Sequence, residues 1–385
     1  MTTASEEPAN ILCLGDTWFP SFPGGLDRYV YELTAALAAD CDRIELMGVS
    51  LPQNDFASTV KLLNIGRSDQ SLLKRLWATR TTFSHRELER LDAINFHFAL
   101  YSFALLAQLP KQVPLTFTFH GPWALESDWE GGNKLGIAVK RWIERQVYRR
   151  CDRFIVLSKA FGQILHESYR VPWQKIHVIP GGVNVESFQP TLERSQARAQ
   201  LNWPTGRFIL FTPRRLVHRM GLDKLLSALV EVKRQRPDVL LVIAGKGPLR
   251  DALEAQTVAL GLQEHVRFLG FLPEVDLPVA YQAADLTVIP SQSLEGFGLI
   301  LLESLACGTP ALCTPVGGMP EVLSNFSPQL ITDSAQTEAI AQKLAAVASG
   351  QIDLPGRAAC RTYAVENFDW AVIAQKVRQV LLSPV

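Results

Sequence analysis

The chain has 385 residues, of which 47% are hydrophobic, 20% charged and 9% aromatic. These proportions exclude the collagen, coiled-coil and disordered classes, and the length favours two domains of similar size. Lys plus Arg and Asp plus Glu each number 38, so the formal net charge is zero. A neutral total argues against chain-wide binding of nucleic acid.

Three features predict a cytoplasmic protein without a metal site. Residues 1–10 include two glutamates and no basic residue, unlike a signal peptide. Residues 93–110 carry no charge, but they include Asn95 and His97, and we interpret them as a strand followed by a helix rather than a membrane span. The six cysteines form no CxxC pair, which indicates buried free thiols in a reducing compartment.

In the N-terminal half, short apolar runs alternate with helical patterns. Residues 11–15 predict a buried parallel strand that ends in glycine. A loop rich in Pro and Gly follows, and residues 26–39 then show helical spacing of apolar side chains. Further strands are expected at 114–119 and 154–157, the latter leading into a helix. Such alternation is typical of βαβ units that build a parallel sheet covered on both faces.

Residues 178–202 resemble a domain connection, and the alternation restarts after them. The expected order is strand 208–211, helix 221–235, strand 239–244, helix 248–260, strand 266–269, helix 278–283, strand 286–289 and helix 298–306. The predicted fold class is therefore α/β, with two Rossmann-like domains whose parallel sheets face a cleft. We expect an N-terminal domain at 1–185 and a C-terminal domain from 186. Ligands of such sheets bind beyond the carboxyl ends of the strands.

Segment 291–308 carries the most informative chemistry. No GxGxxG follows the first strand and no Walker A sequence exists, which argues against NAD binding and ATPase activity. Here a strand leads into a loop with Glu295, and a helix that begins near Gly298 carries Glu303. Backbone N–H groups at a helix start, freed by glycines, suit a diphosphate. The alternative is that Glu295 only complements the helix dipole and Glu303 lies at the surface.

This segment resembles the E-x7-E motif of retaining, GT-B-type glycosyltransferases of family 4, with Glu295 and Glu303 as its two glutamates. The resemblance extends over about residues 11–375. Its other matching segments, in chain order, are Pro23-Gly24-Gly25 (the N-terminal glycine loop), Thr118-Phe119-His120-Gly121 (the active-site histidine), 179–184 (the hinge), Arg215-Leu216 (the basic donor motif), 242–248 and 266–270.

The resemblance implies a role for each matching residue. Glu295 would orient the donor sugar, Glu303 would bind the ribose, and His120 would contact the sugar or its developing charge. Transfer would retain the anomeric configuration through front-face attack, and a final helix at 366–385 would cross back from a donor domain at 186–365 to the first domain. The expected donor-binding residues are Gly24, Gly25, Arg215, Arg219, Gly296, Phe297, Gly298, Leu299 and Glu303.

Physical arguments agree with these roles. Arg215, Arg219 and the helix start near Gly298 could stabilise a departing nucleotide diphosphate without a metal or another cofactor. Gly24 and Gly25 would let the backbone approach the phosphates closely. Each assignment has a structural alternative: an ordinary loop at the two glycines, and a hydrogen-bonded structural histidine at position 120.

The sequence departs from the family pattern at Met220. The family usually has a lysine there, immediately before a glycine, and this lysine clamps the diphosphate. Arg214 or Arg219 could supply the missing charge, because a guanidinium fork suits phosphate oxygens. The sequence leaves open which of them does so.

Residues 133–153 form a basic segment with seven Lys or Arg and two acidic residues. Leu135, Val139, Trp142, Ile143 and Val147 add an apolar stripe at helical spacing. This pattern is compatible with a helix that lies on an anionic membrane, at the inner face. The alternative is a solvated outer helix whose stripe packs on the N-terminal sheet.

The sequence therefore predicts a retaining, metal-independent glycosyltransferase that moves a sugar from a nucleotide-diphosphate sugar (UDP, GDP or another base) to an acceptor hydroxyl. The acceptor could be a glycan, a lipid or a small molecule. Two other functions stay open: a nucleotide-sugar epimerase or hydrolase on the same scaffold, and a non-catalytic sugar-nucleotide binding subunit.

Overall fold

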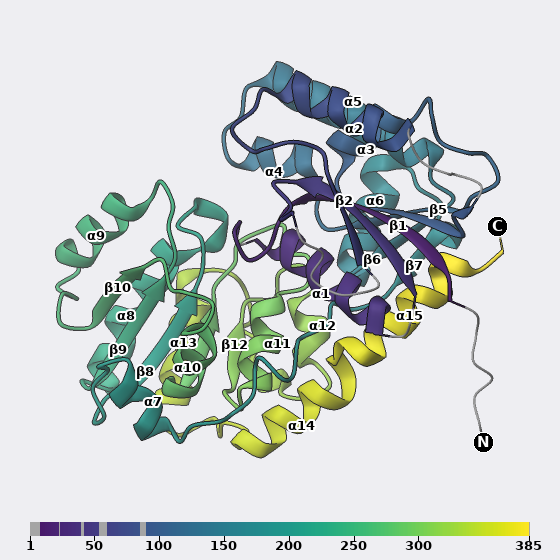
Figure 1. The fold of residues 1–385 in the computed structure, drawn as a ribbon. Helices are drawn as coiled ribbons and strands as arrows, with labels where there is room; N and C mark the ends of the chain where they lie inside the picture. The colour runs from purple at the N-terminus through teal and green to yellow at the C-terminus, as the bar shows by residue number, and fades with distance from the viewer. Residues whose placement is uncertain (1–7, 23, 40–41, 54–59, 85–89, 385) are drawn as a thin grey trace, which may run out of the picture. The chain divides into compact units, whose positions relative to one another are not determined.

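The computed structural model describes residues 8–22, 24–39, 42–53, 60–84 and 90–384. It divides into unit 1, Met1–Gly182 with Trp370–Val385, and unit 2, Val183–Asp369 (Figure 1). The divisions differ slightly from the expected boundaries at 185 and 365. The physical reason is that the two ends of unit 2 pair with each other: the Val183 amide donates to the Phe368 carbonyl at 2.8 Å, and Val183 forms a bridge with Asp369.

Unit 1 contains a seven-stranded parallel sheet in the order β3-β2-β1-β4-β5-β6-β7. The order reverses between β1 and β4, so the loops after these two strands diverge at one point of the sheet edge. The strands are β1 (Asn10–Thr17), β2 (Arg43–Val49), β3 (Val60–Asn64), β4 (Ala93–Phe96), β5 (Leu115–Phe119), β6 (Arg153–Val156) and β7 (Ile176–Val178).

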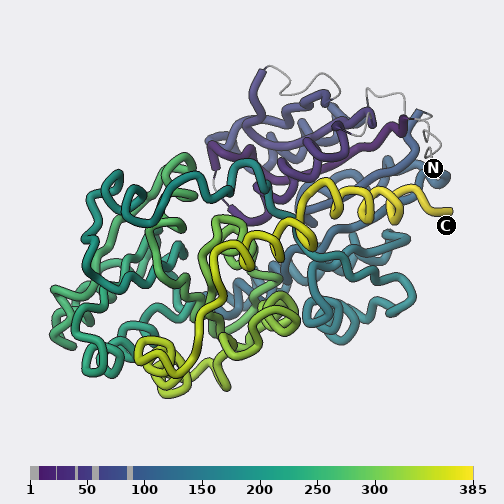
Figure 2. Tube along the Cα trace, turned by 90° about the horizontal axis from the view of Figure 1, so that it is seen from below, coloured from purple at the N-terminus to yellow at the C-terminus, as the bar shows by residue number. Residues whose placement is uncertain are grey.

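Helices cover both faces of this sheet. One face packs on α3, α5 and α6, and the other on α1 and α15, the terminal yellow helix in Figure 2. The helices of unit 1 are α1 (Gly25–Ala39), α2 (Leu72–Ser84), α3 (Ala99–Leu105), α4 (Trp123–Trp129), α5 (Lys134–Arg150), α6 (Lys159–Tyr169), η2 (Trp173–Lys175) and α15 (Trp370–Leu382).

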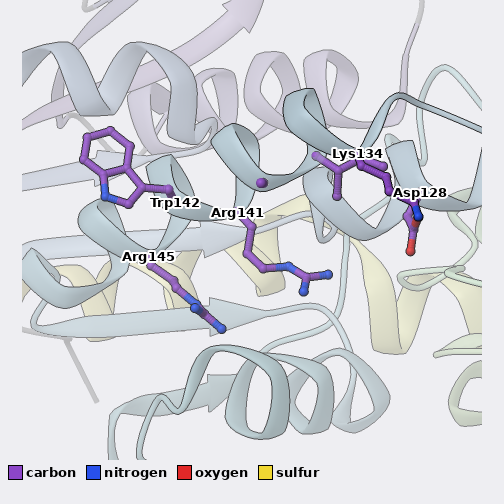
Figure 3. Close-up of a pocket in the computed structure, with 7 residues that line it drawn as sticks. Asp128, Lys134, Arg141, Trp142 and Arg145 are labelled. Atoms are coloured by element: carbon purple, nitrogen blue, oxygen red, sulfur yellow. The ribbon is translucent and has the colours of Figure 1, made fainter.

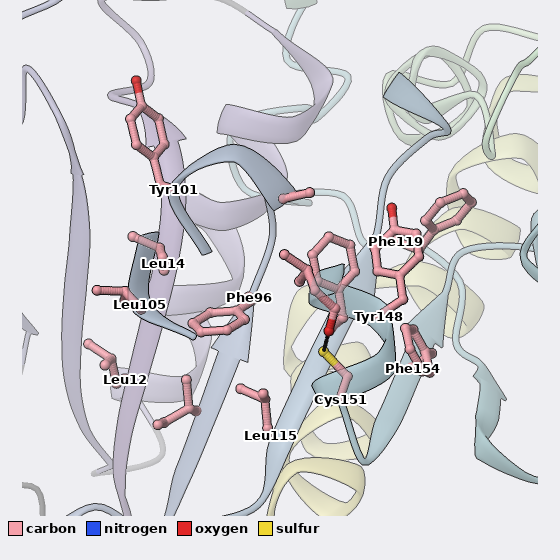
Figure 4. Close-up of a cluster of buried hydrophobic side chains, with 14 of the residues drawn as sticks. Leu12, Leu14, Phe96, Tyr101, Leu105, Leu115, Phe119, Tyr148, Cys151 and Phe154 are labelled. Atoms are coloured by element: carbon pink, nitrogen blue, oxygen red, sulfur yellow. Dashed lines mark hydrogen bonds between the residues drawn. The ribbon is translucent and has the colours of Figure 1, made fainter. Parts of the chain in front are cut away.

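Strand β5 shows how the sequence pattern sets the two faces. Leu115, Phe117 and Phe119 belong to the apolar cluster on the α3–α5–α6 face (Figure 4). Thr116 and Thr118 alternate with them and are buried too, so they lie on the face that α1 and α15 cover. In β5 the apolar side chains therefore join this cluster, whereas the two threonines face the layer formed by α1 and α15.

Unit 2 contains a five-stranded parallel sheet in the order β10-β9-β8-β11-β12. Its strands are β8 (Phe208–Pro213), β9 (Val239–Ala244), β10 (Val266–Gly270), β11 (Leu286–Ile289) and β12 (Ala311–Cys313). Its helices are α7 (Arg194–Gln200), η3 (His218–Met220), α8 (Leu222–Gln235), α9 (Arg250–Ala259), α10 (Leu277–Ala283), α11 (Leu299–Ala306), α12 (Met319–Leu323), η4 (Pro328–Leu330), α13 (Thr337–Ala348) and α14 (Arg357–Phe368).

Several expectations from the sequence have a direct outcome here. The α/β class with two parallel sheets is confirmed. Segment 93–110 forms β4 and α3, and none of the described helices has the length and apolar character needed to cross a bilayer. The five described cysteines are buried and free, whereas Cys41, Pro23 and residues 1–7 lie outside the described residues.

Candidate active site

In unit 2 the predicted site residues follow β8 and β11. These strands are neighbours in the sheet, and the strand order reverses between them. The loop after β8 carries Arg214 and Arg215, and the loop after β11 carries Glu295. Because both strands are parallel, their carboxyl ends place these loops at the same sheet edge, where ligands of open α/β sheets bind.

Glu295 is held in a buried polar network. The Arg214 guanidinium donates both to the Glu295 carboxylate and to the Ser291 hydroxyl. The Ser291 hydroxyl in turn donates to Glu295 Oε2 at 2.9 Å. Burial alone would raise the pKa of the Glu295 carboxyl, but Arg214, with help from Arg219 and Ser291, lowers that pKa below its ordinary value. Glu295 is therefore an oriented carboxylate at neutral pH.

The loop before Glu295 has an unusual backbone. Leu294 has φ of 49°, in the left-handed region that costs a non-glycine residue energy. Its carbonyl accepts a hydrogen bond from Arg219 at 3.4 Å, and the Gln292 amide donates to the Arg219 carbonyl at 2.8 Å. Arg219, on η3, is therefore buried against the Glu295 loop and shapes it.

Gly317 supports Glu295 from the other side. Gly317 has φ of 58°, and a Cβ at this position would collide with the Glu295 carbonyl oxygen. The next amide, Gly318 N–H, donates to that same carbonyl at 3.0 Å. Two consecutive glycines thus allow the backbone to lie directly on Glu295.

Gly245 supports the arginine loop in the same way. It has φ of 140°, and a Cβ there would overlap the Arg214 carbonyl. Backbone hydrogen bonds join this loop to the next one: Arg214 N–H donates to Ala244 at 2.8 Å and Leu216 N–H donates to Lys246 at 3.0 Å. Arg215 lies between these anchored residues with an exposed side chain, while Arg214 is buried.

The α11 helix begins where the sequence predicts a diphosphate site. Gly298 caps it with φ of 80°, and Leu299 is its first residue. Gly296 lies beside Glu295 in the loop, and Phe297 is buried with its ring 5.9 Å from that of Phe368. Glycine at position 298 allows the sharp turn that exposes the first amides of the helix.

Glu303 lies one turn further along α11 and is buried, which contradicts its alternative placement at the surface. Its Oε2 accepts a hydrogen bond of 2.6 Å from the Tyr281 hydroxyl on α10. This contact fixes the direction of the carboxylate from within the unit.

Met220, where the family usually has a lysine, is buried as well. Its side chain is 5% exposed, at the end of η3. A lysine at this place would have to bury part of its side chain, and a buried ammonium is costly unless it is paired. The nearby positive charge comes instead from Arg214, Arg215 and Arg219.

In unit 1, His120 follows β5 and contacts a second histidine. His97 Nδ1 lies 3.0 Å from His120 Nε2, and the Tyr29 ring packs edge-on to His120 at 4.7 Å. Burial lowers the pKa of His120 to about 3 and the pKa of His97 well below its usual value. Both imidazoles are therefore neutral at physiological pH.

The glycine loop of unit 1 leads into α1. At Gly25, which is exposed, a Cβ would meet no atom of the described residues within 4 Å, so their packing does not require glycine there. At Gly24 a Cβ would lie 3.1 Å from the Asp27 carboxylate. That carboxylate accepts a 2.8 Å hydrogen bond from the Thr17 amide and so ties α1 to the end of β1.

Asp16, at the end of β1, is a site candidate that sequence reasoning missed. Burial and the neighbouring Asp27 raise the pKa of Asp16 to about 6, and Arg75 opposes this effect. Arg75 itself donates to the Tyr101 hydroxyl at 2.8 Å. The signal available in the sequence was a carboxylate directly after Ile11–Gly15, at the carboxyl end of the first strand.

The structure thus gathers the predicted residues into two groups. Unit 2 brings together Arg215, Arg219, Glu295, Gly296, Phe297, Gly298, Leu299 and Glu303, and unit 1 holds Gly24, Gly25 and His120. Sequence reasoning missed Asp16, His97, Ser291 and Gly317, and it gave Arg214 no link to Glu295. The residues that join Glu295 to Arg214 are 81 positions apart, a separation that no local pattern reveals.

Asp42, the second aspartate of an Asp-x-Asp pattern that could suggest a metal site, has a structural role. The chain has a single Asp-x-Asp, at Asp40-Cys41-Asp42. Asp42 is fully buried and pairs with Arg378 of α15 at 2.8 Å, and it accepts a 3.0 Å bond from the Ala9 amide. Its carboxylate therefore anchors α15 to the sheet.

Comparison with known proteins agrees with this geometry. Residues 193–383 match the family model described as glycosyl transferases group 1, and residues 23–187 match that of glycosyltransferase family 4. The phosphatidyl-myo-inositol mannosyltransferase of Mycobacterium leprae is 32% identical over 93% of this chain and 92% of its own length. The D-inositol 3-phosphate glycosyltransferase of Segniliparus rotundus is 28% identical over 68% of this chain, which aligns with only 59% of that relative.

A solved structure shares the fold. Anabaena HepE in complex with UDP and glucose superposes with a TM-score of 0.74 at 20% identity, covering 97% of this chain and 99% of the other. Two parallel-sheet units with candidate residues at the carboxyl ends of their strands define the GT-B class of glycosyltransferases. Within that class, the chain belongs to glycosyltransferase family 4.

Proposed function

We propose that this protein transfers a sugar from a nucleotide-diphosphate sugar to an acceptor hydroxyl, with retention at the anomeric carbon. The observation that carries the proposal is the buried Arg214–Ser291–Glu295 network beside the start of α11. A carboxylate held ionised next to a glycine-capped helix start suits a sugar hydroxyl on one side and a diphosphate on the other. Glu295 orients the donor sugar, and Glu303 accepts from the ribose.

The leaving diphosphate would be stabilised by this chain's own charges. Arg214 is committed to Glu295 and Ser291, so we assign the role of the missing lysine to Arg219, with the exposed Arg215 as its partner. Together with the α11 amides, these guanidinium groups meet the charge that develops as the glycosidic bond breaks. The reaction then needs neither a metal nor another cofactor.

In unit 1, we assign Gly24 and Gly25 to the phosphate side of the donor and His120 to its sugar. The open space beside Gly25 is compatible with this assignment, because no described side chain or backbone would block a close approach of phosphate there. Relatives named for inositol phosphate and phosphatidyl-myo-inositol favour an acceptor that carries a phosphate. UDP in the complex of HepE makes UDP the first nucleotide to test.

The deciding experiment incubates the protein with UDP-, GDP-, ADP- and TDP-sugars, with and without inositol phosphate or phosphatidylinositol, in the presence of EDTA. We expect acceptor-dependent release of nucleotide and a product with the donor's anomeric configuration. Glu295→Gln should slow the release strongly, while the exposed control Glu186→Gln should not. A changed sugar without transfer would identify an epimerase, acceptor-independent release a hydrolase, and binding without release a non-catalytic subunit.

We also propose a peripheral position at an anionic, cytoplasmic membrane face, through α5. The stripe expected from the sequence divides in the structure. Ile143 and Val147 are buried, whereas Leu135 is 77%, Val139 49% and Trp142 52% exposed. These three exposed side chains follow helical spacing and form one row on the outer side of the helix.

Basic side chains of α5 accompany this row of exposed apolar side chains. Figure 3 shows Arg141 and Arg145 extending in the same direction from α5, and with Lys134 and Asp128 they line a hollow of about 390 Å³. Glu144 is the one acidic residue of α5, and it is buried, accepting a 2.7 Å bond from Tyr169. The outer side of the helix is therefore basic, which suits anionic headgroups.

Sedimentation with vesicles tests this contact. Vesicles that contain anionic phospholipid should bind the protein at low salt and release it as salt rises. Reversal of Arg141, Arg145 and Arg149 to Glu should abolish binding, whereas the same reversal at exposed Arg67, Arg234 and Lys376 should leave most of it. Equal loss in both triple variants would mean that only net charge matters and that α5 has no membrane role.

A further inference from the structure

Two adjacent strands of unit 1 end at histidines that contact each other. His97 follows β4 and His120 follows β5, and these strands pair in parallel. The imidazole rings are stacked at an interplanar angle of 26°, with centroids 5.3 Å apart. The 3.0 Å separation between His97 Nδ1 and His120 Nε2 is a hydrogen bond, so one of these two nitrogens carries a proton and the other accepts it.

The surroundings keep both rings uncharged. His97 is 2% exposed, and its amide donates to the Leu14 carbonyl at 3.0 Å, which fixes the backbone of the β4 end. Tyr29 packs against both rings, and Trp370 packs on Tyr29 at 5.0 Å. Burial keeps the pKa of each histidine below its ordinary value. Each neutral imidazole then holds one proton, on one of its two nitrogens.

The two possible directions of the His97–His120 hydrogen bond differ in whether they leave an unpaired N–H group in the protein interior. If His120 donated through Nε2, the proton of His97 would be on its own Nε2, which is buried and has no hydrogen-bond partner among the described residues. If His97 donates through Nδ1, its buried Nε2 carries only a lone pair. Buried N–H groups without an acceptor are rarer and costlier than acceptors without a donor. The second arrangement is therefore favoured.

We infer that His97 is a positioning residue, which donates from Nδ1 to His120 Nε2 and so holds the His120 proton on Nδ1. The hydrogen bond at one ring nitrogen selects the tautomer and thereby the chemistry of the other. His120 is then a hydrogen-bond donor toward its ligand, and cannot act as a base through Nδ1. One part of this inference rests on the proposed function, namely that the ligand of His120 is the donor sugar. The His120 Nδ1–H would then donate to a sugar oxygen.

The tautomer can be read without any activity. Protein labelled with ¹⁵N at its seven histidines, with His97→Asn and His120→Asn to assign signals, gives the protonated nitrogen of each ring by two-bond ¹⁵N–¹H correlation. We expect His120 to be protonated at Nδ1 and His97 also at Nδ1, unchanged from pH 8 to pH 5. A His120 signal with the proton on Nε2 would overturn the inference.

Matched substitutions then test the consequence. The amide nitrogen introduced by His97→Asn is as many bonds from Cα as the imidazole Nδ1 and can donate in its place, whereas the carboxylate introduced by His97→Asp can only accept. We expect His97→Asn to keep kcat within about threefold, and His97→Asp to move the His120 proton to Nε2 and lower kcat at least tenfold, with a smaller change in KM. Unchanged kcat in His97→Asp with a reversed tautomer would overturn the positioning role. If wild type transfers no sugar, the proposed function fails, while the spectra still decide the tautomer.

Discussion

At the scale of single residues, Arg214 and Glu295 show how a buried carboxylate can stay ionised and keep a fixed orientation. The carboxylate would be costly to bury alone, and the guanidinium beside it removes that cost while fixing its direction. Ser291 occupies the remaining lone pair of the same oxygen. The pair therefore acts as one unit, a dependence of Glu295 on Arg214 that the sequence did not predict.

Removing the cation should cost much of the stability of unit 2. Arg214→Met leaves a buried carboxylate without its partner, and we expect the free energy of unfolding to fall by about 3–5 kcal/mol. The loss should shrink as pH falls, because Glu295 can then take up a proton. Arg215→Met, at the exposed neighbour, should change stability by less than about 0.5 kcal/mol. Equal denaturant midpoints for the two variants would contradict this account.

Asp16 gives stability a pH dependence of the opposite sign. Its folded pKa of about 6 lies above the ordinary value of 3.8, so the folded state binds the proton more tightly and stability falls as pH rises from about 4 to 6. Asp16→Asn should remove this penalty and raise the free energy of unfolding at pH 8 by about 3 kcal/mol, with little effect at pH 4. Urea titrations at the two pH values check it, with exposed Asp69→Asn as the control. A gain that is equal at both pH values would refute the assignment.

At the scale of elements, short loops between strands and helices carry the site. The loops after β8 and β11 are shaped by contacts with glycines in two other loops, Gly245 and Gly317. Each glycine lies against a carbonyl of a site residue, Arg214 or Glu295. Backbone packing, rather than side-chain packing, therefore sets the position of the buried ion pair.

Alanine substitutions at two glycines can distinguish the effect of this backbone contact from the effect of backbone strain alone. Gly317 and Gly261 have similar φ values of 58° and 66°, but a Cβ at 261 would meet no atom within 4 Å in the part of the chain that the structure describes. Both alanine variants bear the left-handed cost of about 1 kcal/mol, and only Gly317→Ala also displaces the Glu295 backbone. We expect Gly317→Ala to lower Tm several times more than Gly261→Ala and to abolish transfer. Matching Tm values in the two variants would show that the contact with Glu295 is unimportant.

The elements that could be predicted are those with long, continuous apolar runs. Strand 239–244 matches β9 and strand 286–289 matches β11, because each run is buried along its whole length and followed by Gly or Pro. No strand is expected from the sequence at β2 or β3, whose apolar runs are interrupted by charged residues, or at β7 and β12, which have three residues each. Contacts across the chain, such as His97 with His120, depend on strand pairing and leave no periodic signal.

At the scale of the whole molecule, the last helix completes the first unit. Arg378 pairs with the buried Asp42, and Arg153 donates to the Val380 carbonyl at 2.7 Å. Ile373 and Val377 fill the α1 side of the sheet. A helix that begins only at Trp370 thus belongs to the core of unit 1.

The contribution of α15 to the stability of unit 1 can be measured with substitutions at two adjacent residues, one buried and one exposed. Ile373 is fully buried and Val372 is exposed. Ile373→Ala should lower the free energy of unfolding by about 2–5 kcal/mol, because it leaves a cavity, and Val372→Ala should change it by less than about 0.5 kcal/mol. Denaturation followed by tryptophan fluorescence gives both values. A small effect of Ile373→Ala would mean that α15 is only loosely attached.

We propose that unit 2 binds a nucleoside diphosphate with Arg219, Arg215 and the start of α11, without a metal. Calorimetric titration of UDP, GDP, ADP and TDP in EDTA, on wild type and on Arg219→Met, tests it most directly. We predict that at least one of these nucleotides binds in EDTA, and that Arg219→Met weakens its binding at least tenfold, or about 1.4 kcal/mol. Binding that appears only when Mg²⁺ is added, or that is unchanged in Arg219→Met, would contradict it.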